Sequence, residues 1–358
     1  MSEKKYEISI MNAALCLIVI LIHVISAPLA SLTPDAALYK PYMVMNRCAT
    51  FVVQAFIFQS GMKTFLMNKS SRYCEFMHKK IKAIIVPYII AVAIYYLLFV
   101  YVLHYFEFSI RDLAMYIVRG DIAAQFYFII IIIQFYLLYP LWKFIIRQNP
   151  ILPIGISIIV TAILGLYLIF ILDRLFKIDY FPYIDRFFTT YLMYWVGGMF
   201  AGKYYDKFIK FVSKNIIFIF IAFVLSAVID NICLYRYVIH LMRATQLDVL
   251  HAVYCISAIL LCTAVSYKIR DKRIKAIDII DKASYYIYLF HVLFIFAVDY
   301  LMPRLSISIP STTGLFIVRL ALVYISVFVF ANMYVFVKSK QSLKTKNAQR
   351  KHRGGDAG

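Results

Sequence analysis

Three histidines within apolar stretches are the residues best suited to chemistry in this sequence. His23 follows ALCLIVILI, His291 lies in SYYIYLFHVLF, and His251 opens a further apolar run. Ionisable groups at membrane depth are costly and tend to mark functional sites. A neutral imidazole accepts a proton from a hydroxyl group near neutral pH. The histidines therefore indicate general-base chemistry, while hydrogen bonds between packed helices remain the structural alternative.

Polar residues accompany His291 at helical spacing. Tyr285, Tyr288 and His291 recur every three residues, and Ser284 lies four residues before Tyr288, so a helix places them on one face. That face is expected to look into a bundle rather than into lipid. An interhelical hydrogen-bond stripe explains this pattern as well as catalysis does.

A second cluster combines a cation with a small-residue pair. Arg47 precedes FVVQAFIFQSGM, which ends with Ser60 and Gly61. A guanidinium group remains charged in proteins, so Arg47 requires a carboxylate, a phosphate or water nearby. Small residues such as Ser60 and Gly61 allow two helices to approach closely.

The elements that position these residues are membrane-spanning helices. The chain has 358 residues, of which 63% are hydrophobic and 16% charged, and its mean hydropathy is +0.80. Soluble domains are about 45–50% apolar, so a soluble enzyme is excluded. We predict an all-α integral membrane protein, a bundle of about ten transmembrane helices, because one crossing takes about 20 apolar residues. The predicted spans are 8–29, 43–66, 83–104, 124–146, 151–172, 187–204, 214–235, 247–267, 283–302 and 312–337.

The distribution of charge predicts the orientation. Lys and Arg total 38 against 18 Asp and Glu, but the basic residues lie between apolar runs, which argues against nucleic acid as a partner. One set of alternate loops carries 27 of the 38. Because Lys and Arg are retained in the cytoplasm, both termini are predicted to be cytoplasmic. The excess positive charge is also expected to attract the anionic headgroups of membrane lipids.

Three regions follow from this topology: a cytoplasmic N-terminus at 1–7, a transmembrane domain at 8–337, and a basic cytoplasmic tail at 338–358 that is predicted to be disordered. The six cysteines form no CxxC pair, and no metal-binding, P-loop or nucleophilic-serine motif is present. No metal site is predicted.

Six motifs in order resemble one family. They are the first-span His23, the second span ending in SG, HKKIKAIIVP, a fourth span ending in YP, WVGGMFAGK and SYYIYLFH. This series resembles the acyltransferase 3 family of multispanning O-acyltransferases over about residues 8 to 337. Within the family it looks like the branch with the membrane protein of poly-N-acetylglucosamine biofilm operons, described both as an exporter and as an O-succinyltransferase.

The resemblance implies a multi-pass protein of the bacterial plasma membrane that moves an acetyl or succinyl group. The donor would be cytoplasmic acyl-CoA, a co-substrate rather than a bound cofactor, and the acceptor a hydroxyl of a cell-surface or exported carbohydrate. His23 would be the catalytic residue. The family's arginine position is occupied here by Asn12, about 16 Å from His23 along a helix. Lys79, Lys80 and Lys82 are candidates to supply the missing charge for the donor phosphates.

In the expected reaction, His23 deprotonates the acceptor hydroxyl, which attacks the thioester. Arg47, together with Tyr288 or His291, would stabilise the oxyanion or orient the acceptor, and Ser60 is a further supporting candidate. A covalent acyl-histidine remains an alternative.

Two other functions remain open on the sequence. One is an exporter of an exopolysaccharide or a lipid-linked glycan, for which the many aromatic residues would line a path. The other is a non-catalytic membrane partner of a glycan synthase. No fused extracytoplasmic transferase domain is expected after the last span, so an enzyme would either act alone on the acceptor or hand its acyl group to a separate transferase.

Overall fold

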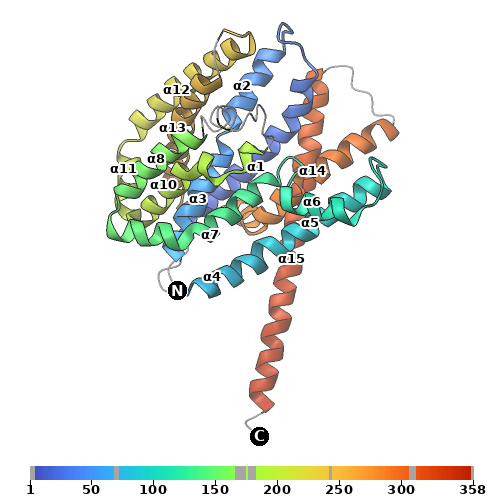
Figure 1. Cartoon of the computed structure of the whole chain (residues 1–358). Helices are drawn as coiled ribbons and strands as arrows, with labels where there is room; N and C mark the ends of the chain where they lie inside the picture. Colours follow the sequence, from blue (N-terminus) through green and yellow to red (C-terminus); the bar gives the residue numbers. More distant parts are fainter. Residues whose placement is uncertain are drawn as a thin grey trace.

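The protein is a bundle of helices in the computed structural model, which describes residues 5–67, 72–165, 175, 183–241, 244–305 and 312–355 (Figure 1). No strand occurs within these ranges. Seven helices in them are long and apolar enough to cross a membrane. They are Tyr6–Ala30, Tyr73–Tyr101, Tyr127–Gln148, Ile216–Val238, Asp248–Lys268, Lys275–Arg304 and Thr312–Gln341.

Helix α1 (Tyr6–Ala30) is the centre of the bundle. In the most apolar part of α1, 61% is buried inside the protein, which is the largest share among the seven candidate spans. The corresponding share for α12 (Ile216–Val238) is 17%. Helix α1 packs against α14 (Lys275–Arg304), α13 (Ala244–Lys268) and α15 (Thr312–Gly355). A side chain on α1 therefore faces protein in most directions, while α12 lies at the periphery.

The remaining helices surround this centre. Residues 73–101 form one continuous helix that contains a short π-helical turn. The helices that surround α1, in addition to those already given, are α2 (Tyr39–Ala49), α3 (Val52–Met67), α4 (Tyr73–Lys80), η1 (Ile81–Ile85), α5 (Val86–Tyr101), α6 (Ile110–Arg119), α7 (Tyr127–Gln148), α8 (Leu152–Val160), η2 (Thr161–Gly165), η3 (Ile184–Arg186), η4 (Phe188–Tyr191), α10 (Leu192–Lys203) and α11 (Tyr205–Lys214).

Three of the ten predicted spans are not among the seven. The span predicted at 43–66 is two helices, α2 and α3, separated at Thr50 and Phe51. The Thr50 hydroxyl donates to the Arg47 carbonyl oxygen at 2.7 Å, a local bond that competes with helix continuation. The 16 residues of α3 extend about 24 Å, less than the hydrocarbon core of about 30 Å.

The other two short segments are the fifth and sixth predicted spans. The fifth is helical over Leu152–Leu164, and residues 166–172 of its predicted range lie outside the described residues. The sixth starts with the short turn η4 before α10. Gln134 of α7 holds this start, because its amide donates to the Arg186 carbonyl at 2.7 Å and its oxygen accepts from the Phe188 amide at 3.1 Å.

Glycines bring α3 and α10 into close contact. A Cβ atom at Gly61 would collide with the backbone oxygen of Trp195, and one at Gly198 with the backbone oxygen of Phe58. The sequence predicted such an approach for the Ser60–Gly61 pair, and the structure shows it.

Helix α15 continues past the apolar segment as far as Gly355 and projects beyond the rest of the bundle (Figure 1). Residues 338–355, predicted as a disordered tail, are thus helical in the structure, and residues 356–358 lie outside its description. The segment KSKQSLKTKNAQRK contains no proline and is rich in Lys, which favours helix.

Candidate acyl-transfer site

His23 and His291 face each other across the interface between α1 and α14. Their ring centroids are 5.0 Å apart with an interplanar angle of 48°. His291 is fully buried, whereas His23 is half-buried. In the described part of the chain, no side chain hydrogen-bonds to His23. The pair is therefore a packed contact in which the His23 ring keeps its polar atoms available to a ligand.

The hydrogen bonds of His291 assign its tautomer. Its Nδ1 lies 2.8 Å from the Tyr288 carbonyl oxygen and 3.2 Å from that of Ile287. Both partners accept hydrogen bonds, so Nδ1 carries a proton. Nε2 is buried and has no partner among the described residues. His291 is therefore a neutral ring that packs against the His23 ring.

His23 lines a small cavity of about 230 Å³. This volume is below the roughly 300–1,000 Å³ of a typical pocket for a drug-sized ligand, so the cavity suits one small group. Its walls come from α1, α3, α7, α13 and α14, and its lining residues are Val19, Ile22, His23, Thr50, Val53, Gln54, Phe56, Gln125, Tyr127, Phe128, Tyr191, His251 and Tyr288.

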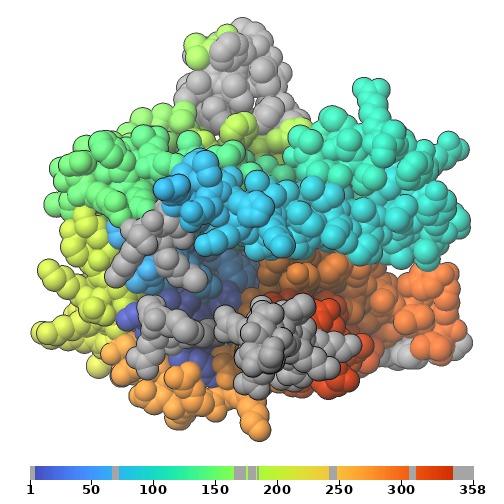
Figure 2. All heavy atoms as spheres, turned by 90° about the horizontal axis from the view of Figure 1, so that it is seen from below, coloured from blue at the N-terminus to red at the C-terminus, as the bar shows by residue number. Residues whose placement is uncertain are grey.

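A second cavity of about 520 Å³ lies beside the first and is lined by four lysines. Phe56, Phe128 and Tyr288 line both cavities and thus form a shared wall. The four lysines are Lys63, Lys80, Lys282 and Lys338, and Asp281 is the acidic residue among the lining side chains. Seen from below, the light-blue residues of α4 continue into the cyan α5, and the orange residues of α14 lie next to this helix (Figure 2).

Tyr288 is held in this wall by its hydroxyl group, which donates to the backbone oxygen of Gln125. The Gln125 amide donates in turn to the Tyr95 hydroxyl at 2.9 Å and to the Leu289 carbonyl at 3.2 Å. The ring of Tyr288 lies between the two cavities. Its hydroxyl proton is used in the bond to Gln125, just before the start of α7.

Asn12 and Ser60 are part of the lysine-lined cavity. The Asn12 amide donates to an oxygen of Asp281 and to the Ser284 hydroxyl, each at 2.8 Å. The Ser60 hydroxyl lies 3.3 Å from the Tyr136 hydroxyl. Asn12 therefore ties α1 to α14, and Ser60 ties α3 to α7.

The three candidate lysines have different surroundings. Lys80 lines the cavity and donates to the Tyr136 hydroxyl at 3.3 Å. Lys79 and Lys82 are exposed and are not among the described lining residues.

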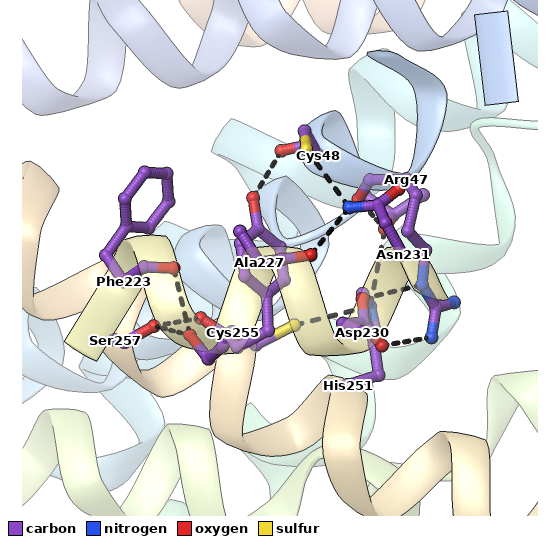
Figure 3. Close-up of polar contacts among 12 residues, drawn as sticks. Arg47, Cys48, Phe223, Ala227, Asp230, Asn231, His251, Cys255 and Ser257 are labelled. Atoms are coloured by element: carbon purple, nitrogen blue, oxygen red, sulfur yellow. Dashed lines mark hydrogen bonds and ion pairs between the residues drawn. The ribbon is translucent and has the colours of Figure 1, made fainter. Parts of the chain in front are cut away.

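Arg47 is engaged elsewhere. Its Nε and a terminal nitrogen donate to the two oxygens of Asp230, at 2.8 and 2.9 Å. Asp230 is fully buried and also accepts from Nδ1 of His251 at 2.9 Å (Figure 3). Within the described chain Arg47 does not line the His23 cavity. Its guanidinium group is therefore linked to the cavity indirectly, because it binds Asp230, and Asp230 binds the cavity-lining His251.

Asp230 and His251 are the residues that sequence reasoning missed or underrated. Asp230 is the lone acidic residue within the apolar helix α12, which is the signal that marks an intramembrane ionisable group. The carboxylate that Arg47 required lies 183 residues away in the sequence, a separation that no local pattern reveals.

No metal site is visible among the described side chains: no three of their His, Cys, Asp or Glu residues group together as ligands.

No curated protein and no solved structure matches the chain. A family model does: the one described as an acyltransferase domain matches residues 5–331, which is nearly the whole chain. The match includes every helix that lines the two cavities except the last part of α15. This chain, a multi-pass helical membrane protein with a histidine cavity beside a lysine-lined one, therefore belongs to the acyltransferase 3 family.

Proposed function

We propose that the protein transfers an acyl group from cytoplasmic acyl-CoA to a hydroxyl group of a cell-surface or exported carbohydrate. The observation that carries this proposal is the wall of Phe56, Phe128 and Tyr288 shared by the His23 cavity and the lysine-lined cavity. A donor held in the larger cavity would have to pass a short wall of side chains for its thioester to reach His23.

The larger cavity matches the chemistry of coenzyme A. Lysine ammonium groups bind phosphates, and Lys63, Lys80, Lys282 and Lys338 supply four of them against the single carboxylate of Asp281. Asn12 occupies the family's arginine position and itself lines the larger cavity, so the lysines make up for the missing guanidinium charge. Lys80 is the candidate among the three predicted lysines that the cavity supports.

In the reaction, the acceptor oxygen attacks the thioester carbonyl carbon while His23 takes the hydroxyl proton. An ester bond forms, the carbon–sulfur bond breaks, and the proton passes from His23 to the coenzyme A thiolate. His291, whose Nδ1 is committed to backbone oxygens, holds the His23 ring in place. The donor is acetyl- or succinyl-CoA, and the acceptor is a carbohydrate of the poly-N-acetylglucosamine type, on the resemblance given above.

The test is the amount of ester-linked acyl groups that mild base releases from the surface carbohydrate. Cells without the gene would carry the wild-type protein, His23→Ala, the control His78→Ala, or no protein. His78 is exposed on α4, outside both sets of described lining residues. We expect His23→Ala to match the cells without protein, and His78→Ala to match the wild type, at equal protein levels.

The same cells distinguish the proposal from its alternatives. Normal acylation with His23→Ala would refute the proposed role of this residue. A carbohydrate that stays inside the cell when the protein is absent, and is exported normally with His23→Ala, would instead establish an exporter.

A further inference from the structure

A second imidazole, that of His251, lines the same cavity as His23. It enters from α13, whereas His23 enters from α1. The side chain of His251 is 13% exposed, and its Nδ1 lies 2.9 Å from the buried Asp230 carboxylate. The reaction proposed above uses one imidazole, so the second requires an explanation.

The surroundings of His251 determine which of its nitrogens faces the cavity as an acceptor. The Asp230 carboxylate accepts a proton from Nδ1, and Arg47 balances the carboxylate charge through two hydrogen bonds. A neutral ring with its proton on Nδ1 has a free electron pair on Nε2. Asp230 and Arg47 are thus positioning residues that make Nε2 a hydrogen-bond acceptor.

The described neighbours of Nε2 satisfy it poorly. The Thr50 hydroxyl is 3.3 Å away, and its proton has a nearer acceptor in the Arg47 carbonyl oxygen at 2.7 Å. The Cys255 sulfur is 3.4 Å away and is a weak donor. A hydroxyl group normally approaches its acceptor to about 2.5–3.0 Å. A ligand hydroxyl in the cavity would therefore be a better partner than either neighbour.

The arrangement around His251 is fixed by the helices that carry it. The Tyr254 hydroxyl donates to the Cys48 carbonyl at 2.7 Å, which ties α13 to α2 one turn from His251. Figure 3 shows Arg47, Asp230 and His251 joined in a chain of contacts between α2, α12 and α13. His251 thus presents Nε2 from a rigid wall.

We propose that Nε2 of His251 binds a hydroxyl group of the acceptor, so that a single sugar unit is held between His251 and His23. The proposal rests on the acyl transfer proposed above and adds the acceptor side of the site. One hydroxyl of the sugar reacts at His23, and a neighbouring hydroxyl donates to His251. The cavity volume of about 230 Å³ agrees with one small unit rather than a longer chain segment.

Two substitutions at one position separate binding from structural support. In His251→Asn, the amide nitrogen takes the place of Nδ1 and still donates to Asp230, but nothing replaces Nε2. In His251→Gln, the longer side chain can place an oxygen acceptor near the position of Nε2. Asn231→Ala is the matched control, since Asn231 is on the same helix as Asp230 and contacts Cys48 and Ala227 without lining the described cavity.

The measurements are ester-linked acyl groups on the surface carbohydrate, and the affinity of the purified full-length protein for coenzyme A. His251→Asn is expected to lower acylation about ten-fold, the effect of one lost hydrogen bond at the upper end of its usual range. His251→Gln is expected to remain within about three-fold of the wild type, since it keeps an acceptor. Coenzyme A affinity and thermal stability are expected to stay unchanged in both, and Asn231→Ala to acylate normally.

Wild-type acylation with His251→Asn would overturn the inference, and so would equal losses with Asn and Gln at unchanged coenzyme A affinity. A parallel loss of acylation, coenzyme A affinity and stability in both variants would assign His251 a structural role and would also overturn it. Equal acylation in cells with the wild-type protein and in cells without the protein would refute the acyl-transfer proposal itself, which is a different result.

Discussion

At the scale of single residues, neighbouring lysines have different surroundings. Lys80 lines the larger cavity and contacts Tyr136, whereas Lys79 is exposed one position earlier on the same helix. An ammonium group inside a cavity can hydrogen-bond to a bound phosphate, and such a charged hydrogen bond contributes roughly 1.5–3 kcal/mol. An exposed lysine contributes little because water screens it.

We therefore expect Lys80→Ala to raise the KM for acyl-CoA about 10- to 100-fold, and Lys79→Ala to leave it nearly unchanged. Steady-state kinetics of the purified protein with acetyl-CoA and succinyl-CoA would measure both. An equal effect of the two substitutions would show that general attraction to the basic surface, rather than this cavity, binds the donor.

The sequence identifies candidates at this scale but not their partners. His23, His291 and Ser60 were found as polar residues within apolar runs, and Asn12 and Lys80 through the family resemblance. The structure places His23, Ser60, Asn12 and Lys80 in the lining of a cavity, and His291 against the His23 ring. Arg47 was expected to stabilise the oxyanion or to orient the acceptor, whereas the structure pairs it with Asp230. Only three-dimensional packing brings α2 and α12 together, so the ion pair with Asp230 could not be read from the chain.

At the scale of elements, the interface of α3 and α10 depends on two backbones in direct contact. A Cβ atom added at Gly198 would collide with the backbone oxygen of Phe58, while one added at the neighbouring Gly197 would lie 4.0 Å from the Phe58 ring. A backbone atom cannot move aside as a side chain can, so added volume at Gly198 must separate the helices.

Gly198→Ala is accordingly expected to destabilise the protein by about 1–3 kcal/mol. Gly197→Ala is expected to be neutral or slightly stabilising, since Ala favours helix by up to about 1 kcal/mol over Gly. Thermal unfolding of the two variants in the same detergent is the comparison. Equal melting temperatures for Gly198→Ala and the wild type would contradict the close approach.

The elements also show where hydropathy is informative. Long apolar runs such as 214–235 predict a helix that spans a membrane, because burial of the whole backbone in lipid requires one. At the break, the Thr50 hydroxyl donates to the Arg47 carbonyl oxygen, and the Arg47 side chain binds Asp230. A mean hydropathy over the whole segment does not register either hydrogen bond, and it therefore predicted one helix at 43–66.

At the scale of the whole molecule, the orientation predicted from basic residues can be checked with a natural probe. Cys74 is exposed on α4, in the lysine-rich segment assigned to the cytoplasm, whereas Cys16 and Cys255 are buried. A membrane-impermeant maleimide added to intact cells is expected to leave Cys74 unmodified and to label it after permeabilisation.

Cys74→Ser identifies the labelled position, since it should remove that signal. Labelling of Cys74 in intact cells would reverse the predicted orientation and place the lysine-lined cavity on the wrong side for a cytoplasmic donor.

The wall of Phe56, Phe128 and Tyr288 has a consequence for the cell as well as for the reaction. An enzyme that takes its donor from one side of a membrane and its acceptor from the other contains two water-accessible halves. If both halves opened into each other, protons and ions would leak and dissipate the membrane potential. Under the proposed function, these three side chains would act as a seal, and the catalytic cycle would have to let the acyl group pass while the membrane stays tight.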